Sequence, residues 1–198
     1  TDAGTDQVIC SGEDVSLSGT ISSVSGNGLW TSSGDGSFSS DTDLNAVYTP
    51  SVNDTTAGQV TLYLESTDIG NCSVVIDSII VDITPRPYVD GGSDQTICSN
   101  STAILTGVVS GSSTTGEWLT SGDGYFTPDA NSLNAEYVPG TADTIAGQVT
   151  LTLQSTNSCL EHDTVIVNFT TAPFVDAGTD ETICADQDQV SLTGTIYG

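Results

Sequence analysis

The chain has 198 residues, with 26 Asp and Glu against one Lys or Arg, which gives a formal net charge of −25. A surface whose one permanent side-chain cation is Arg86 cannot neutralise phosphates. The charge therefore excludes nucleic acid as a partner and opposes binding to anionic membranes. No apolar run approaches the roughly 18 residues of a membrane span, so direct membrane insertion is excluded as well.

The sequence repeats itself. The segment from Asp2 to Cys10 recurs with small changes from Asp90 to Cys98 and from Asp176 to Cys184, so the period is 88 and then 86 residues. Such a period indicates stacked copies of one structural unit. We predict two complete β-sandwich repeats and the first two strands of a truncated third. Their ranges are 1–86, 87–172 and 173–198.

Each repeat contains short apolar segments separated by clusters of Gly, Ser, Asn and Asp. Val15 and Leu17 predict an early strand, residues 60–64 alternate apolar and polar side chains, and residues 73–83 predict a later apolar strand. About seven strands fit into each repeat, with no helical periodicity. The fold class is therefore all-β, as tandem immunoglobulin-like sandwiches. Trp30 and Trp118 are expected to fill the two cores from the third strand.

Two Ser-Gly-Asp-Gly segments follow these tryptophans, at residues 33–36 and 121–124. Asp-Gly is the usual pair in a two-residue hairpin turn, because both central residues of that turn need positive φ. We expect hairpin turns at both places rather than ligand-binding loops.

Five cysteines fall at repeating positions in a chain that has no zinc-like spacing, which favours disulfides in an oxidising, extracellular compartment. The simplest pairing joins Cys10 to Cys72 and Cys98 to Cys159, leaving Cys184 unpaired. It leaves the fewest orphan thiols, and we prefer it slightly. The sandwich geometry favours a different bond, from Cys10 to Cys159, because the first turn and the last hairpin of one sandwich lie at opposite ends.

The motif Asp-x-Gly-x-Asp opens each repeat. Two carboxylates with nearby carbonyl groups could begin a calcium site that stiffens the joint between repeats. The alternative is a solvated turn leading into the first strand, and no cofactor is required. The six candidate calcium ligands are Asp2, Asp6, Asp90, Asp94, Asp176 and Asp180.

The residue types give little support to catalysis. His162 is the one histidine, so a nucleophile–His–Asp triad cannot be repeated in both modules. Acid–base chemistry would have to depend on carboxylates alone, and no unique carboxylate pair stands out from the repeat. We predict that the chain is not an enzyme and has no catalytic residue.

Two resemblances follow from these motifs. The segment from Trp30 to Gly36 resembles the Trp-Asp-Phe-Gly-Asp-Gly signature of polycystic-kidney-disease-type (PKD) sandwich repeats, with polar residues replacing Asp-Phe. Four motifs together resemble the tandem repeats of SprB-type gliding-motility adhesins of Bacteroidota. They are the Asp2–Cys10 segment, the tryptophan strand at 30–38 and 118–126, Leu-Asn-Ala-x-Tyr at 44–48 and 133–137, and Ala-Gly-Gln-Val-Thr-Leu at 57–62 and 146–151.

The second resemblance implies a long cell-surface filament, exported by type IX secretion and moved by the gliding motor. Asp-Ser/Thr-apolar triplets also resemble the O-glycosylation motif of Bacteroidota, which makes Ser78, Thr144 and Thr164 candidate sites. We expect an extracellular spacer segment of an adhesin whose partners are neighbouring repeats and a surface polysaccharide or substratum. The alternatives are a calcium-assisted carbohydrate-binding module and accessory β-domains of a secreted enzyme.

Overall fold

A computed structural model describes residues 1–22, 27–67, 70 and 73–197. It contains 43% strand and 6% helix, which confirms the all-β prediction. The chain divides into two compact units. The first consists of residues 1–88, 109–114 and 155–161, and the second of residues 89–108, 115–154 and 162–198. The first unit thus contains the first sequence repeat together with two loops from the second.

Seven strands of the first repeat form two sheets. One has the order β1-β7-β6-β3 and the other the order β2-β5-β4. Four strands against three, with the chain crossing between the sheets after β1, β2, β3 and β5, make an immunoglobulin-like sandwich. The strands are β1 (Gln7–Cys10), β2 (Val15–Ser16), β3 (Gly28–Ser32), β4 (Ser37–Phe38), β5 (Val47–Thr49), β6 (Gln59–Ser66) and β7 (Ile76–Thr84).

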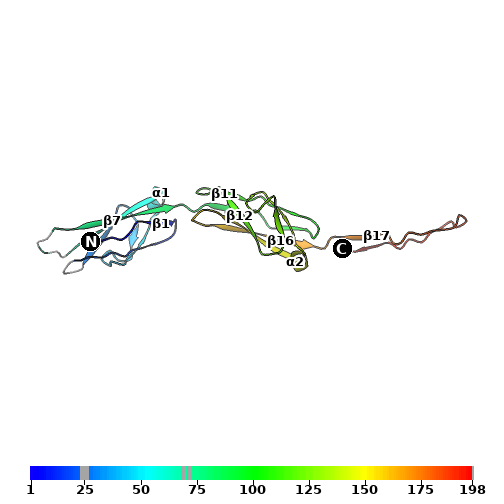
Figure 1. Cartoon of the computed structure of the whole chain (residues 1–198), viewed down its shortest axis with the longest axis horizontal. Coiled ribbons are helices and arrows are strands. Elements are labelled where there is room, and N and C mark those ends of the chain that lie inside the picture. The colour runs from blue at the N-terminus through cyan, green and yellow to red at the C-terminus, as the bar shows by residue number, and fades with distance from the viewer. Residues whose placement is uncertain (23–26, 68–69, 71–72, 198) are drawn as a thin grey trace. The chain divides into compact units, whose positions relative to one another are not determined.

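Strands β1 and β7 are labelled in Figure 1. Strand β1 runs parallel to β7, and Cys10 pairs with Thr84 at the end of both strands. This arrangement explains why β1 needs the whole repeat before it can pair: its partner is the last strand. The apolar segment predicted at 73–83 is β7 itself, which begins at Ile76.

The core lies between the two sheets. Trp30 on β3, 1% exposed, and Leu62 on β6, fully buried, come from one sheet, and Tyr48 on β5, also fully buried, comes from the other. Phe38 stacks on Trp30 with ring centroids 6.5 Å apart and tilts against Tyr48 at 4.8 Å. Burying each large apolar side chain contributes roughly 2–3 kcal/mol. The prediction that the tryptophan fills the core is confirmed.

The second repeat builds the same two sheets, in the orders β12-β15-β16-β9 and β10-β14-β13. Trp118, 1% exposed, takes the place of Trp30, and its Nε1 donates to the carbonyl of Leu133 at 3.2 Å. A separate pair joins β8 to β11. The strands are β8 (Tyr88–Asp90), β9 (Gln95–Cys98), β10 (Ala103–Ile104), β11 (Val108–Ser110), β12 (Gly116–Thr120), β13 (Tyr125–Thr127), β14 (Glu136–Val138), β15 (Gln148–Ser155) and β16 (His162–Thr170).

The last part of the chain forms a single antiparallel pair of β17 (Phe174–Asp176) and β18 (Thr195–Tyr197) (Figure 1). Residues 181–184, the counterpart of β1, carry no strand. The reason is topological, because β1 and β9 each pair with the last strand of their own repeat.

Two short helices were not predicted: α1 (Val52–Ala57) and α2 (Thr141–Ala146). Each lies between the fifth and sixth strands of its repeat and ends at a glycine with positive φ, Gly58 or Gly147. Neither is long or apolar enough to span a membrane, and no other helix occurs in the described ranges.

The expected hairpin turns at 33–36 and 121–124 are wrong. Strand β3 pairs with β6, whereas β4 pairs with β5, so the segment 33–36 crosses from one sheet to the other. Gly36 and Gly124 are not among the glycines with positive φ that a two-residue turn would need. These glycines have another use, which the buried carboxylates described below explain.

Candidate functional site

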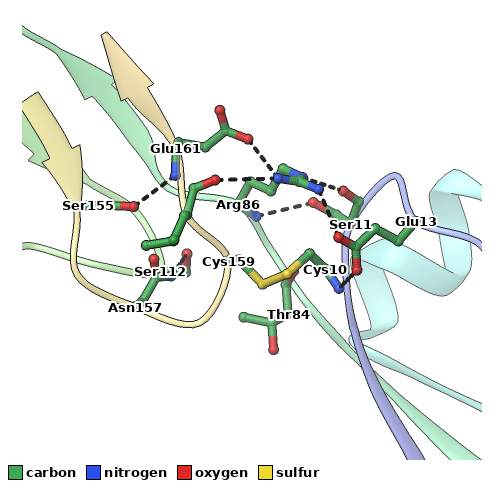
Figure 2. The surroundings of a disulfide bond; sticks show 11 residues. Cys10, Ser11, Glu13, Thr84, Arg86, Ser112, Ser155, Asn157, Cys159 and Glu161 are labelled. Carbon is green, nitrogen blue, oxygen red and sulfur yellow. Dashed lines mark hydrogen bonds and ion pairs between the residues drawn. A yellow bond between two sulfur atoms is a disulfide. The ribbon is translucent and has the colours of Figure 1, made fainter. Parts of the chain in front are cut away.

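A disulfide and a double ion pair form one side-chain cluster, and all of it lies in the first compact unit (Figure 2). We call it the Cys10–Cys159 cluster; its residues are Cys10, Ser11, Glu13, Thr84, Arg86, Cys159 and Glu161. The bond joins two positions 149 residues apart in the sequence, with Cα atoms separated by 5.5 Å. A residue of the first sequence repeat is thereby covalently linked to a residue of the second.

The slight preference for disulfides within each repeat is wrong. Cys10 is bonded to Cys159, and Cys98 is a free, exposed thiol. The alternative that sandwich geometry favoured is the one in the structure. Cys184 is likewise free and exposed, and Cys72 lies outside the described residues.

The topology gives the physical reason. Cys10 lies beside Thr84, at the far end of β7 from the β6–β7 connection to which Cys72 belongs in sequence. At about 3.3 Å per residue, the nine residues of β7 cover roughly 26 Å, far more than the ~6 Å that separates the Cα atoms of a disulfide.

Cys159 reaches this place on the loop between β15 and β16. The loop is closed at its base by two hydrogen bonds between Ser155 and Glu161, one from each backbone N–H, both of 2.9 Å. Cys159 is 1% exposed, and its sulfur lies 3.8 Å from the carbonyl oxygen of Thr84.

Arg86 closes the cluster from the linker that follows β7. One guanidinium nitrogen contacts Glu161 at 3.0 Å and another contacts Glu13 at 3.1 Å, and Nε donates to the carbonyl of Ser11 at 2.9 Å (Figure 2). The second oxygen of Glu13 accepts the backbone N–H of Cys10. The one Lys or Arg side chain of the sequence therefore lies between two carboxylates that flank the disulfide.

A second kind of cluster occurs once in each repeat, around a buried carboxylate. The hydroxyl of Tyr48 donates to Asp54 at 2.7 Å, and the backbone N–H groups of Gly36 and Ser51 donate to the same oxygen at 3.1 and 3.0 Å. Asp35 donates its N–H to the other oxygen at 3.3 Å. The carboxylate holds the start of α1 against the crossing segment that was expected to be a hairpin turn.

Asp143 repeats this arrangement with Tyr137, Gly140 and Asp123, at 2.6, 2.9 and 3.1 Å. Burial acts to raise the pKa of Asp143, but the hydrogen bonds from Tyr137 and from backbone N–H groups together outweigh it and lower the pKa. Burial and the adjacent carboxylate raise the pKa of Tyr137 to about 12. The donors surround these acids, so they act as fold-fixing acceptors rather than as a catalytic pair.

The carboxylates proposed as calcium ligands also have partners in the chain. Asp2, Asp90 and Asp176 each accept the N–H of a glycine two residues later, and each of these glycines has positive φ. Asp6 and Asp94 accept the N–H of Ile80 and Ile166, on the last strand of their repeats. These contacts favour the interpretation as turns. Asp180 is exposed, and no group of three or more metal-ligating side chains occurs among the described residues. A calcium site stays a prediction.

The other candidates lie on the surface. His162 is exposed at the start of β16, opposite Gln154. Of the candidate O-glycosylation sites, Ser78 and Thr164 are exposed and Thr144 is partly buried on α2. The sequence could have revealed the Asp54 cluster, because Ser51 and Asp54 stand three residues apart, as in a capping box.

Comparison with known proteins adds a fold likeness only. No family model matches the chain, and no curated protein matches it. Among solved structures, it is similar to mouse cadherin-23 EC22-24 (12% identity, TM-score 0.36, covering 99% of this chain and 75% of that one). It is also similar to the insect immune protein hemolin (11% identity, TM-score 0.46), covering 85% of this chain and 46% of that one. The chain thus spans about half the length of hemolin. These likenesses are too weak to carry an argument, so the assignment as tandem immunoglobulin-like sandwiches rests on the strand order described above.

Proposed function

We propose that the chain is a spacer segment of a large cell-surface adhesin filament, of the SprB type that serves gliding motility in Bacteroidota. The observation that carries the proposal is the bond between Cys10 and Cys159, which ties two sequence repeats together across 149 residues. A disulfide suits an extracellular position. Repeated sandwiches with a strongly acidic surface suit a segment that provides length and resists collapse and aggregation.

The disulfide would also determine which residues carry tension. When the two ends of the chain are pulled, force passes from Cys10 directly to Cys159, and the residues between them are removed from the load path. The bypassed segment joins two cysteines 149 positions apart and includes most strands of both repeats. At about 3.3–3.6 Å per residue, it corresponds to roughly 500 Å of extension that the oxidised chain cannot release.

Single-molecule pulling of the full chain, attached at its two ends, tests this mechanical part. The oxidised chain is expected to reach a final extension about 500 Å shorter than the Cys10→Ser/Cys159→Ser variant. A Cys98→Ser variant is the matched control, because it also removes a thiol but leaves the bond intact. Equal final extensions for the oxidised chain and the double variant would rule out the load bypass.

The cellular part of the proposal needs a separate experiment. Antibodies raised against this chain should label filaments on unpermeabilised cells of the source organism and should slow their gliding over a surface. Labelling that appears only after permeabilisation would contradict the surface location. Surface labelling without any effect on gliding would leave an adhesin repeat but remove the role in motility.

The rival proposal is a calcium-assisted carbohydrate-binding module. One hollow of about 430 Å³ lies beside the Asp54 cluster and is lined in part by Asp35 and Asn53. Asp54 contributes to its wall, but both oxygens of that carboxylate already accept hydrogen bonds from the chain. A glycan array probed with and without calcium separates the two proposals, because saturable binding of a sugar by this chain would contradict a pure spacer.

A further inference from the structure

The free thiol of Cys98 stands in the place that Cys10 occupies one repeat earlier. Cys10 ends β1 opposite Thr84, and Cys98 ends β9 opposite Thr170, in the same parallel register. Both residues end the same sequence motif, yet Cys10 is bonded and Cys98 is free and exposed.

The backbone around the two cysteines also agrees. Ser11 donates its N–H to the carbonyl of Thr84 at 2.9 Å, and Ser99 donates to Thr170 at 2.9 Å. The side-chain oxygen of Ser11 accepts the N–H of Arg86 at 3.1 Å, and that of Ser99 accepts the N–H of Ala172 at 3.3 Å. The strand end, the following turn and the start of the linker therefore have the same local geometry in both repeats.

In the first repeat this geometry receives a cysteine from the next one. The sulfur of Cys159 lies 3.8 Å from the carbonyl of Thr84, the residue paired with Cys10. Among the described residues, no cysteine is bonded to Cys98. The sequence after residue 172 contains Cys184 but no second counterpart of Cys159.

We propose that Cys98 is a cross-linking site for a second copy of this repeat. Its partner is the cysteine at the position of Cys159, on the loop between the last two strands, in a repeat placed directly after residue 172. In an array of such repeats, each joint would carry one disulfide between the first strand of one repeat and the last hairpin of the next.

The chemistry of the bond is ordinary thiol–disulfide exchange. The Cys98 thiolate attacks a disulfide oxidant such as glutathione disulfide, forms a mixed disulfide and releases one glutathione thiol. The incoming cysteine then displaces the second glutathione, so two protein thiols are oxidised to one disulfide while one glutathione disulfide is reduced to two thiols. The inference rests on the proposed function only in requiring that a further repeat follows.

The test inserts a second copy of residues 87–172 between Ala172 and Pro173 of the full chain, so that every repeat keeps its native boundaries and a native kind of neighbour. In the inserted copy, Leu160→Val marks the cysteine peptide by mass and Cys98→Ser removes the duplicate thiol. Leu160 is exposed, so this marker should not disturb the fold. The chain is refolded in a glutathione redox buffer, alkylated, digested and mapped by mass spectrometry without reduction.

The expected result is two disulfides: Cys10 with the original Cys159, and the original Cys98 with the inserted copy of Cys159. A Cys98→Ser change in the original copy should then leave the inserted cysteine free for alkylation. The proposal is overturned if Cys98 is alkylated in the three-repeat chain, or if the inserted cysteine pairs with Cys184. Neither result would bear on the surface location of the parent protein, which the antibody experiment tests separately.

Discussion

The hydroxyl of Tyr137 donates a hydrogen bond of 2.6 Å to the carboxylate of Asp143, and both side chains are almost completely buried. The same bond joins Tyr48 to Asp54 in the first repeat, at 2.7 Å. A buried carboxylate is costly unless its oxygens are hydrogen-bonded. In both repeats the tyrosine therefore contributes an essential donor from the fifth strand to the helix that follows it.

Replacing Tyr137 with Phe should destabilise the second repeat by about 1–3 kcal/mol, because the buried carboxylate loses its shortest hydrogen bond while the ring remains in the core. Tyr48→Phe should have a similar effect on the first repeat. Urea unfolding followed by tryptophan fluorescence measures both changes. The control is Tyr125→Phe, whose ring is 63% exposed. If Tyr125→Phe and Tyr137→Phe lower the unfolding free energy by the same small amount, the proposed role of the Tyr137 hydroxyl is refuted.

Asp143 should make the second repeat sensitive to acid. Hydrogen bonds lower its pKa in the folded state despite its burial, whereas the unfolded value is about 3.9. A group of this kind stabilises the fold above its unfolded pKa, and the stabilisation is lost as pH falls through the folded pKa.

The Asp143→Asn variant isolates this effect from the general loss of negative charge in acid. The wild-type chain should be more stable than the variant at pH 7, and the difference should shrink as pH falls below about 4. Unfolding by urea at a series of pH values measures the difference. Asp186→Asn, in the exposed C-terminal segment, should show no such trend. If the difference in unfolding free energy between wild type and Asp143→Asn stays constant down to pH 2, the ionised carboxylate of Asp143 does not stabilise the second repeat in the way proposed.

Gly122 is required for a reason other than its backbone conformation. A Cβ atom at this position would lie 1.6 Å from Oδ1 of Asp143, and one at Gly34 would lie 1.8 Å from Oδ1 of Asp54. We expect Gly122→Ala to cost about 3 kcal/mol, because the carboxylate must leave its donors.

A double-mutant cycle separates this cause from a general effect of the added methyl group. Combined with Asp143→Ser, which shortens the obstructing side chain, Gly122→Ala should cost much less than it does alone. Gly147→Ala is a useful contrast, because its Cβ would meet nothing within 4 Å while its φ is +77°. It should cost about 1–2 kcal/mol and show no coupling to Asp143→Ser. Additive costs for Gly122 and Asp143 would exclude the steric explanation.

The sandwich was predictable because it depends on local patterns. Alternating apolar residues such as Val60, Leu62 and Leu64 indicate strands wherever they occur, and the buried Trp30 and Trp118 follow from the repeat. The two helices were missed because six residues are too few for a helical period to appear. The signal that existed was Ser51 followed three residues later by Asp54.

The two clusters could be predicted only in part, because they depend on contacts that are distant in sequence. The Asp-Gly pair at residues 35–36 has the sequence of a hairpin turn. Gly36 is needed there for another reason, because a Cβ atom at this position would lie 2.5 Å from the hydroxyl oxygen of Tyr48. The disulfide required knowledge of which strand ends meet. Minimising the number of unpaired thiols favoured Cys10–Cys72, whereas strand topology favoured Cys10–Cys159. The topology was correct, because the nine residues of β7 extend farther than a disulfide can span.

Arg86 should matter most at low salt. Its two ion pairs, with Glu13 and Glu161, are partly exposed, so each should contribute only about 0.2–1 kcal/mol. Arg86→Gln removes both attractions and makes the net charge of an already acidic chain more negative by one. Added salt should stabilise both the wild type and the variant, because it screens the repulsion among carboxylates. The gain should be larger for the variant, which has no Arg86 attractions for salt to weaken. The difference in unfolding free energy between wild type and variant should therefore narrow between 20 mM and about 500 mM NaCl.

Arg86→Lys is the control, because it keeps the charge but loses the planar guanidinium that reaches two carboxylates. Its unfolding free energy should lie between those of the wild type and Arg86→Gln. A difference in unfolding free energy between wild type and Arg86→Gln that is independent of salt would show that Arg86 acts through the hydrogen bond from its Nε to the carbonyl of Ser11 rather than through its charge.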